Sequence, residues 1–140
     1  MEMDQYRQGK MVKLVCEGCR LGDKGQLESM ILSTCKLLGM TYLSGPFYGD
    51  VTGEGDNDGT SAILIIKESH IALHSWPKRN ALRVVVDSCK DFSLFELVSF
   101  FFEYLKPRNI IIYEEKISDC IEAEDFYFNK LLLDDTLDSC

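Results

Sequence analysis

The chain has 140 residues, of which 46% are hydrophobic, and this predicts one domain with a modest core that would benefit from burial against a second subunit. Its formal net charge of −8 argues against nucleic acid as a partner, because binding to phosphate requires clustered lysine and arginine, and equally against an anionic membrane surface. No apolar run is long enough to span a bilayer and no signal peptide is recognisable, so we expect a cytoplasmic protein whose six cysteines are free thiols.

The first half of the chain predicts a strand, a helix and a second strand. Apolar residues favour the first strand at 12–16. Asp23 is typical of a helix N-cap, and Gly39 is placed to end that helix. A strand is expected at 42–48, and the glycine- and aspartate-rich segment 49–59 predicts a mobile loop.

The second half predicts further strands and one more helix. A buried strand rich in β-branched residues is expected at 61–67, its hairpin partner at 71–76 and another strand at 82–87. Ser93 and Glu96 form a capping box that opens a helix, Pro107 stops it, and a last strand follows at 109–113. The expected fold class is therefore α+β, a two-layer sandwich of a mainly antiparallel sheet with both helices on one face. We divide the chain into a domain at 1–115 and an acidic C-terminal extension at 116–140.

The most informative segment is 68–77, with the sequence ESHIALHSWP. It resembles the self-cleavage site of the prokaryotic S-adenosylmethionine decarboxylases. The sequence GTS at 59–61 is similar to the Gly-x-Ser that precedes the cleavage strand in that family, and SC at 88–89 is placed like its Thr-Cys. The resemblance spans about 9–113 and implies the same two-layer fold.

The resemblance also implies how the cofactor forms. Ser69 would attack the carbonyl carbon of Glu68, and β-elimination of the ester would leave residue 69 as a pyruvoyl group. Such a group condenses with a substrate amine and draws electrons from the bond to the carboxylate, so no metal is expected. By the same resemblance His74 is the processing base, Ser61 assists processing and Cys89 returns a proton during decarboxylation.

The implied function of domain 1–115 is pyruvoyl-dependent decarboxylation of S-adenosylmethionine, which supplies the aminopropyl donor for spermidine in polyamine biosynthesis. Three departures leave the substrate open. Lys78 stands where the family usually has a glutamate for the ribose hydroxyls, and loop 49–59 is acidic where an aromatic is expected against adenine. Around the cysteine, Asp87 and Lys90 replace an apolar residue and a glycine. The alternative is the same cofactor acting on L-arginine or L-ornithine, giving agmatine or putrescine. The candidate substrate-binding residues are Phe47, Tyr48, Asp56, Asp58 and Lys78.

Other interpretations of these residues are weaker. His70 and His74 have the spacing of zinc ligands on a helix, but here they fall in a predicted strand, where side chains four apart stand too far from each other. A catalytically silent homologue that regulates an active partner would be expected to lose Ser69 or Cys89, and both are present. We expect an enzyme that binds a small-molecule substrate and forms a homo-oligomer, such as a dimer, of processed chain pairs.

Overall fold

The computed structural model describes residues 4–116 and 122. Apart from Lys116 and Glu122, the predicted extension at 116–140 lies outside the described residues, so its boundary stays a prediction. Neither helix in the described part is long and apolar enough to cross a membrane.

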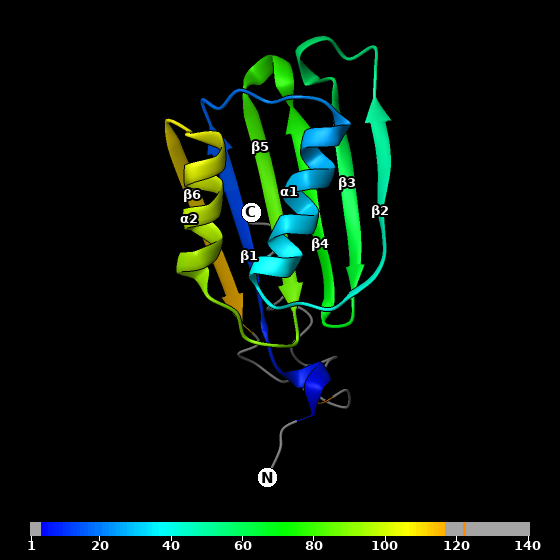
Figure 1. The fold of residues 1–140 in the computed structure, drawn as a ribbon, viewed down its shortest axis with the longest axis vertical. Helices are drawn as coiled ribbons and strands as arrows, with labels where there is room; N and C mark the ends of the chain where they lie inside the picture. Colours follow the sequence, from blue (N-terminus) through cyan, green and yellow to red (C-terminus); the bar gives the residue numbers. More distant parts are fainter. Residues whose placement is uncertain (1–3, 117–121, 123–140) are drawn as a thin grey trace.

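Within these residues the chain folds into one six-stranded antiparallel sheet, with both helices on the same face (Figure 1). The strands are β1 (Lys10–Glu17), β2 (Tyr42–Val51), β3 (Gly59–Ile66), β4 (Ser69–Trp76), β5 (Ala81–Ser88) and β6 (Asn109–Lys116). Their spatial order is β2-β3-β4-β5-β1-β6. The helices are α1 (Lys24–Leu37) and α2 (Leu94–Leu105), and short 3-10 turns are η1 (Gln5–Arg7), η2 (Gly55–Asn57) and η3 (Pro77–Arg79). The predicted α+β two-layer sandwich is confirmed.

The helix ends follow from local sequence as predicted. The Asp23 side chain accepts the backbone N–H of Gln26, and the Ser93 hydroxyl accepts that of Glu96, so each helix has a capped N-terminus. Helix α2 ends at Leu105, before Pro107.

The predicted loop at 49–59 is wrong at both ends. Strand β2 continues to Val51 and strand β3 begins at Gly59, so the connection shortens to 52–58. The low strand propensity of this segment is overridden by pairing, because Asp50 lies opposite Thr60 and accepts its hydroxyl at 2.8 Å.

The core lies between the sheet and the helices. Alternate strand residues point toward α1 and α2 and are fully or nearly buried, among them Val12, Leu14, Leu64, Ile71, Leu73, Val84 and Val86. The helices contribute Leu27, Met30, Ile31, Leu97 and Phe101 to the same cluster. This packing fixes which face each strand residue occupies.

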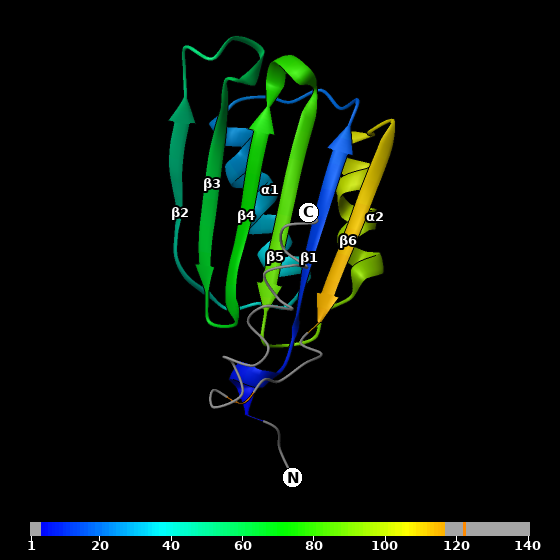
Figure 2. The ribbon, with the colours of Figure 1, turned by 180° about the vertical axis from the view of Figure 1, so that it is seen from behind.

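No helix of residues 4–116 lies over the opposite face of the sheet, hereafter the uncovered face (Figure 2). In the antiparallel register Ser61 of β3 lies opposite His74 of β4, and His70 lies opposite Asp87 of β5. The residues predicted for chemistry therefore gather on the uncovered face and at the β3–β4 turn.

Candidate active site

The peptide between Glu68 and Ser69 lies where the tight β3–β4 turn enters strand β4. Ser69 has a φ of 153°, a conformation that L residues rarely adopt and that costs about 1–3 kcal/mol. The Glu68 carbonyl oxygen accepts the backbone N–H of Cys89 at 3.0 Å. The Glu68 carboxylate accepts the backbone N–H of Thr41, with both oxygens at 3.1 Å. The predicted cleavage peptide is thus strained and anchored on both its backbone and its side chain.

The Ser69 hydroxyl has two close neighbours. It donates a hydrogen bond to Asp87 Oδ2 at 2.8 Å, and its Oγ lies 3.1 Å from His70 Nδ1. The His70 ring nitrogen is 4.0 Å from the same carboxylate oxygen. Sequence reasoning noted Asp87 as a substitution but did not place it in the site. The signal that could have found it is hairpin pairing of β4 with β5, which sets Asp87 opposite His70.

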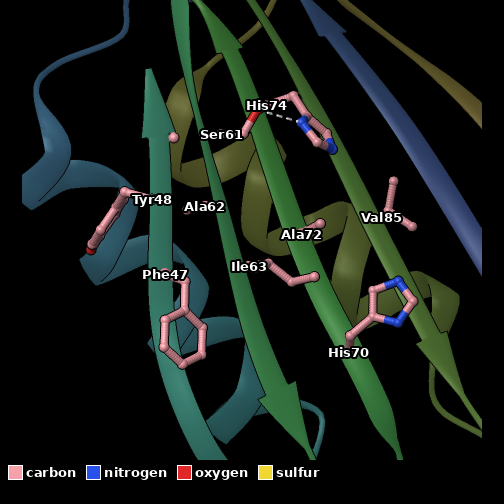
Figure 3. Close-up of a pocket in the computed structure, with 10 residues that line it drawn as sticks. Phe47, Tyr48, Ser61, Ala62, Ile63, His70, Ala72, His74 and Val85 are labelled. Carbon is pink, nitrogen blue, oxygen red and sulfur yellow. Dashed lines mark hydrogen bonds between the residues drawn. The ribbon is translucent and has the colours of Figure 1, made fainter. Parts of the chain in front are cut away.

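His74 and Ser61 form a second polar pair, with Ser61 Oγ 2.8 Å from His74 Nδ1 (Figure 3). Burial, and next the positive charge of Arg83 directly across the β4–β5 ladder, lower the pKa of His74 below its ordinary 6.5. The imidazole is therefore neutral at pH 7 and can accept a proton.

These two polar groups are separated along the strand. His74 is five residues beyond Ser69, about 16 Å at the usual rise of an extended chain. His70, Ser61 and His74 line a pocket of about 500 Å³ on the uncovered face. Glu68 and Cys89 instead line a polar pocket of about 470 Å³. The structure therefore brings Glu68, Ser69 and Cys89 together at the turn, and Ser61 with His74 in the first pocket.

The candidate substrate residues also divide into two places. Phe47 and Tyr48 line the first pocket, and their rings point in different directions from β2 (Figure 3). The Tyr48 ring lies near Lys24 of α1, whose Nζ is 5.8 Å from the ring centre. Lys78 of η3 lies with Asp56 and Asp58 at the far end of β3 and β4. Its Nζ is 3.7 Å from an Asp58 carboxylate oxygen and donates to the Gly55 carbonyl at 3.3 Å.

The acidic loop is therefore distant from Ser69 within one chain. Strand β4 separates Ser69 from the loop end of the sheet by about 23 Å, at roughly 3.3 Å for each residue. Asp50, which begins this acidic segment, is paired with Lys24 at 2.8 Å. The hydrogen bonds that Lys24 and Thr60 donate to Asp50, together with the Lys24 charge, hold the pKa of the Asp50 carboxyl below its ordinary range.

Neither the cysteines nor the other ligand-type residues form a metal site in the described part of the chain. No group of three or more His, Cys, Asp or Glu side chains is placed there to hold an ion. Cys16 and Cys19 have the spacing Cys-x-x-Cys and are buried in the core. Burial, together with the neighbouring Cys19, raises the pKa of Cys16 to about 12. A thiol held in its protonated form is a poor nucleophile and a poor ligand.

The fold and the turn together define a class: a two-layer α+β sandwich in which the β3–β4 hairpin presents a strained serine after an anchored glutamate. The family model described as S-adenosylmethionine decarboxylase matches residues 14–116, and the chain belongs to this family.

Individual proteins agree with this assignment. The chain is 35% identical over 74 residues to the S-adenosylmethionine decarboxylase proenzyme of Sulfolobus acidocaldarius, covering 53% of this chain and 56% of that protein. It is 33% identical over 76 residues to the arginine decarboxylase proenzyme of Pyrobaculum arsenaticum, covering 52% and 53%. These alignments thus span little more than half the length of either relative. The crystal structure of the adenosylmethionine decarboxylase from Aquifex aeolicus matches the fold with a TM-score of 0.68 at 18% identity, covering 83% of this chain and 95% of that one.

The first prediction concerns His74. Replacing Arg83 by Gln removes a neighbouring positive charge, so the pKa of His74 should rise toward 6.5 but stay below it, because burial remains the larger cause. An NMR titration of the histidine ring protons measures this directly. Because the unfolded chain binds the His74 proton more tightly, stability should decline as pH falls below 6.5, and less steeply in the variant.

Arg79→Gln is the matched control, because Arg79 bonds Asn57 and is not among the causes of the His74 shift. An unchanged or lowered His74 pKa in Arg83→Gln would show that the charge across the ladder does not act on this ring.

Proposed function

We propose that this chain is a self-cleaving, pyruvoyl-dependent decarboxylase of polyamine biosynthesis. The observation that carries the proposal is the Glu68–Ser69 turn, in which the serine has a φ of 153° and the preceding carbonyl accepts the Cys89 N–H at 3.0 Å. Membership of the family supports it, as do the relatives named as proenzymes.

The turn supplies two requirements of self-cleavage. When Ser69 Oγ adds to the Glu68 carbonyl carbon, negative charge develops on the carbonyl oxygen, and the Cys89 N–H is already bonded to that atom. Breaking the peptide there also relieves the unfavourable backbone conformation of Ser69. A base would then take the Cα proton of residue 69 while the ester loses Glu68 as a carboxylate by β-elimination. Hydrolysis of the resulting dehydroalanine end would release ammonia and leave a pyruvoyl group.

The residues at the turn fit such a group, because residue 69 opens a strand and has polar partners on the neighbouring strand end. A pyruvoyl group there would supply an electrophilic carbonyl for the substrate amine and an acceptor for the electron pair of the bond to the carboxylate. Cys89 would return a proton to the substrate carbon, because a thiol can act as a general acid. His74, with its lowered pKa, remains the proposed processing base together with Ser61, as the acceptor of the Cα proton that β-elimination removes.

We propose S-adenosylmethionine as the substrate. The first pocket supports this because Phe47, Ile63 and Val85 give it an apolar wall suited to a flat adenine ring. The relatives from Sulfolobus acidocaldarius and Sulfurisphaera tokodaii are named as S-adenosylmethionine decarboxylase proenzymes. Lys78 is engaged with Asp58 and Gly55, which makes it a weak argument against a nucleoside.

The second candidate substrate is a basic amino acid, L-arginine or L-ornithine. Two observations favour it: relatives from Pyrobaculum arsenaticum and Caldivirga maquilingensis are named arginine decarboxylase proenzymes, and the Asp87 carboxylate lies 2.8 Å from Ser69 Oγ. The acidic loop supports it less than its composition suggested, because Asp56 and Asp58 lie at the other end of β4.

The remaining parts of the proposal concern assembly and location. We keep the homo-oligomer and the cytoplasmic location expected from composition. The uncovered sheet face supports assembly, because Phe47, Ile63, Ile111 and Tyr113 are each more than a third exposed there. A catalytically silent regulator remains the contrasting function, and the self-cleavage and turnover tests below separate it from an enzyme.

The second prediction is cleavage between Glu68 and Ser69. Purified protein should give two fragments on denaturing electrophoresis, and the mass of the second should match pyruvoyl in place of serine. Ser69→Ala should remain one chain because it lacks the nucleophile, whereas Ser29→Ala, which alters an exposed serine of α1, should cleave like the wild type. A wild-type protein that stays intact after long incubation contradicts the proposal.

The third prediction separates processing from turnover. Cys89→Ala keeps the backbone N–H that contacts Glu68, so it should still cleave. Its decarboxylation rate should fall about 10²-fold or more, as expected for loss of a general acid. His74→Ala should instead accumulate uncleaved precursor. Cys35→Ala, which removes a buried thiol of α1, serves as the control for the loss of a sulfhydryl group. Full activity in Cys89→Ala would mean that another group supplies the proton.

The fourth prediction is the substrate. Release of carbon dioxide should be seen with S-adenosylmethionine and be absent with L-arginine and L-ornithine under the same conditions. Asp58→Asn should change kcat/KM by less than about twofold, because a carboxylate already paired near the surface contributes little. Turnover of L-arginine or L-ornithine without S-adenosylmethionine would select the second candidate.

A further inference from the structure

Ser69 Oγ lies between an imidazole and a carboxylate. Its partners are His70 Nδ1 at 3.1 Å and Asp87 Oδ2 at 2.8 Å. His70 follows Ser69 in β4, whereas Asp87 belongs to β5 and is brought there by the register that sets it opposite His70. The site therefore contains an acidic group beside the nucleophile that the family resemblance does not explain.

The hydrogen bonds define a direction for the Ser69 proton. An ionised carboxylate only accepts hydrogen bonds, so the single hydroxyl proton points at Asp87. With its proton directed at Asp87, Ser69 Oγ offers His70 only its lone pairs. His70 Nδ1 must therefore carry a proton and donate it to Ser69 Oγ. We infer this tautomer from the network. The resulting chain runs from His70 through Ser69 to Asp87 and leaves an oxygen lone pair for attack.

The geometry makes Asp87 a nearer proton acceptor than His74. The His74 ring is bonded to Ser61 at 2.8 Å and belongs to a residue five positions along the strand from Ser69. The Cys89 N–H donates to the Glu68 carbonyl oxygen of the target peptide. A nucleophile, a base and an oxyanion donor thus meet at one turn, which is the arrangement that acyl transfer requires.

We propose that Asp87 is a catalytic residue of self-cleavage, accepting the Ser69 hydroxyl proton as Oγ attacks Glu68, while His70 positions that hydroxyl. This rests on the self-cleavage proposed above. In the step, the bond from Oγ to the Glu68 carbonyl carbon forms and the hydroxyl proton moves to Asp87. As the bond from that carbon to the Ser69 nitrogen breaks, the proton passes to the nitrogen, which regenerates the carboxylate. No oxidant or reductant is needed.

Other charged residues lie near the same carboxylate. Lys10 of β1 and both Glu115 and Lys116 of β6 line a small cavity that includes Asp87, although the Lys10 ammonium is paired with Asp91 at 3.1 Å. A simple pH profile would therefore combine several titrations. The decisive readout is the chemical step at which a variant stops.

The test compares Asp87→Asn, Asp87→Glu and the wild type during self-cleavage of freshly refolded precursor. The Asp87 side chain is 44% exposed, so the fold does not depend on it, and a thermal unfolding scan checks this. Asp87→Asn should slow cleavage about 10²-fold or more because an amide cannot take the proton, and Asp87→Glu should recover part of the rate. Glu103→Gln, which neutralises an exposed carboxylate of α2, should cleave at the wild-type rate.

Hydroxylamine locates the block, because it cleaves an ester but leaves a peptide bond intact. Asp87→Asn should yield no hydroxylamine-dependent fragment, since its chain stops before the ester forms. Accumulation of a hydroxylamine-sensitive ester, or cleavage at the wild-type rate, would overturn the role of Asp87 while leaving self-cleavage intact. An uncleaved wild type would instead overturn the proposed function, and the role of Asp87 with it.

Discussion

The pairing of β4 with β5 is the constraint on which the site depends. It fixes Asp87 opposite His70 and Arg83 opposite His74, and it brings Cys89, just beyond β5, to the Glu68 carbonyl. A shift of one residue would send each side chain to the other face of the sheet. Such a shift would also move Val84 and Val86 out of the core, so the packing energy that stabilises the fold also keeps the reactive groups in place.

Much of the fold could be predicted from the sequence because its signals are local. The caps at Asp23 and Ser93 and the alternation of apolar residues define the helices and most of the strands. The predicted loop at 49–59 is too long because glycine and aspartate disfavour strands, while the ladder that extends β2 and β3 depends on a partner strand. Propensity describes one segment at a time and contains no information on pairing.

The site divides in the same way. Family resemblance supplied Ser69, Ser61, His74 and Cys89 as residues, but it did not place them relative to each other, and the structure separates them into two groups. From the sequence, Asp87 is recognisable only as a substitution, because its contact with Ser69 joins two neighbouring strands. Lys78 is the opposite case, a substitution that stands out in the sequence. Its charge suggested altered substrate contacts, but its partners are Asp58 and Gly55 at the loop end of the sheet.

The order of strands has a consequence for a chain cut after Glu68. The first fragment would contain β1, β2 and β3, and the second would contain β4, β5 and β6. Because β1 lies between β5 and β6, a strand of the first fragment pairs with two strands of the second. Strand β3 of the first fragment also pairs with β4 of the second. The two fragments would thus share one continuous sheet. Separating them would require three ladders to open together, so the cut chain would retain the shape of the intact one.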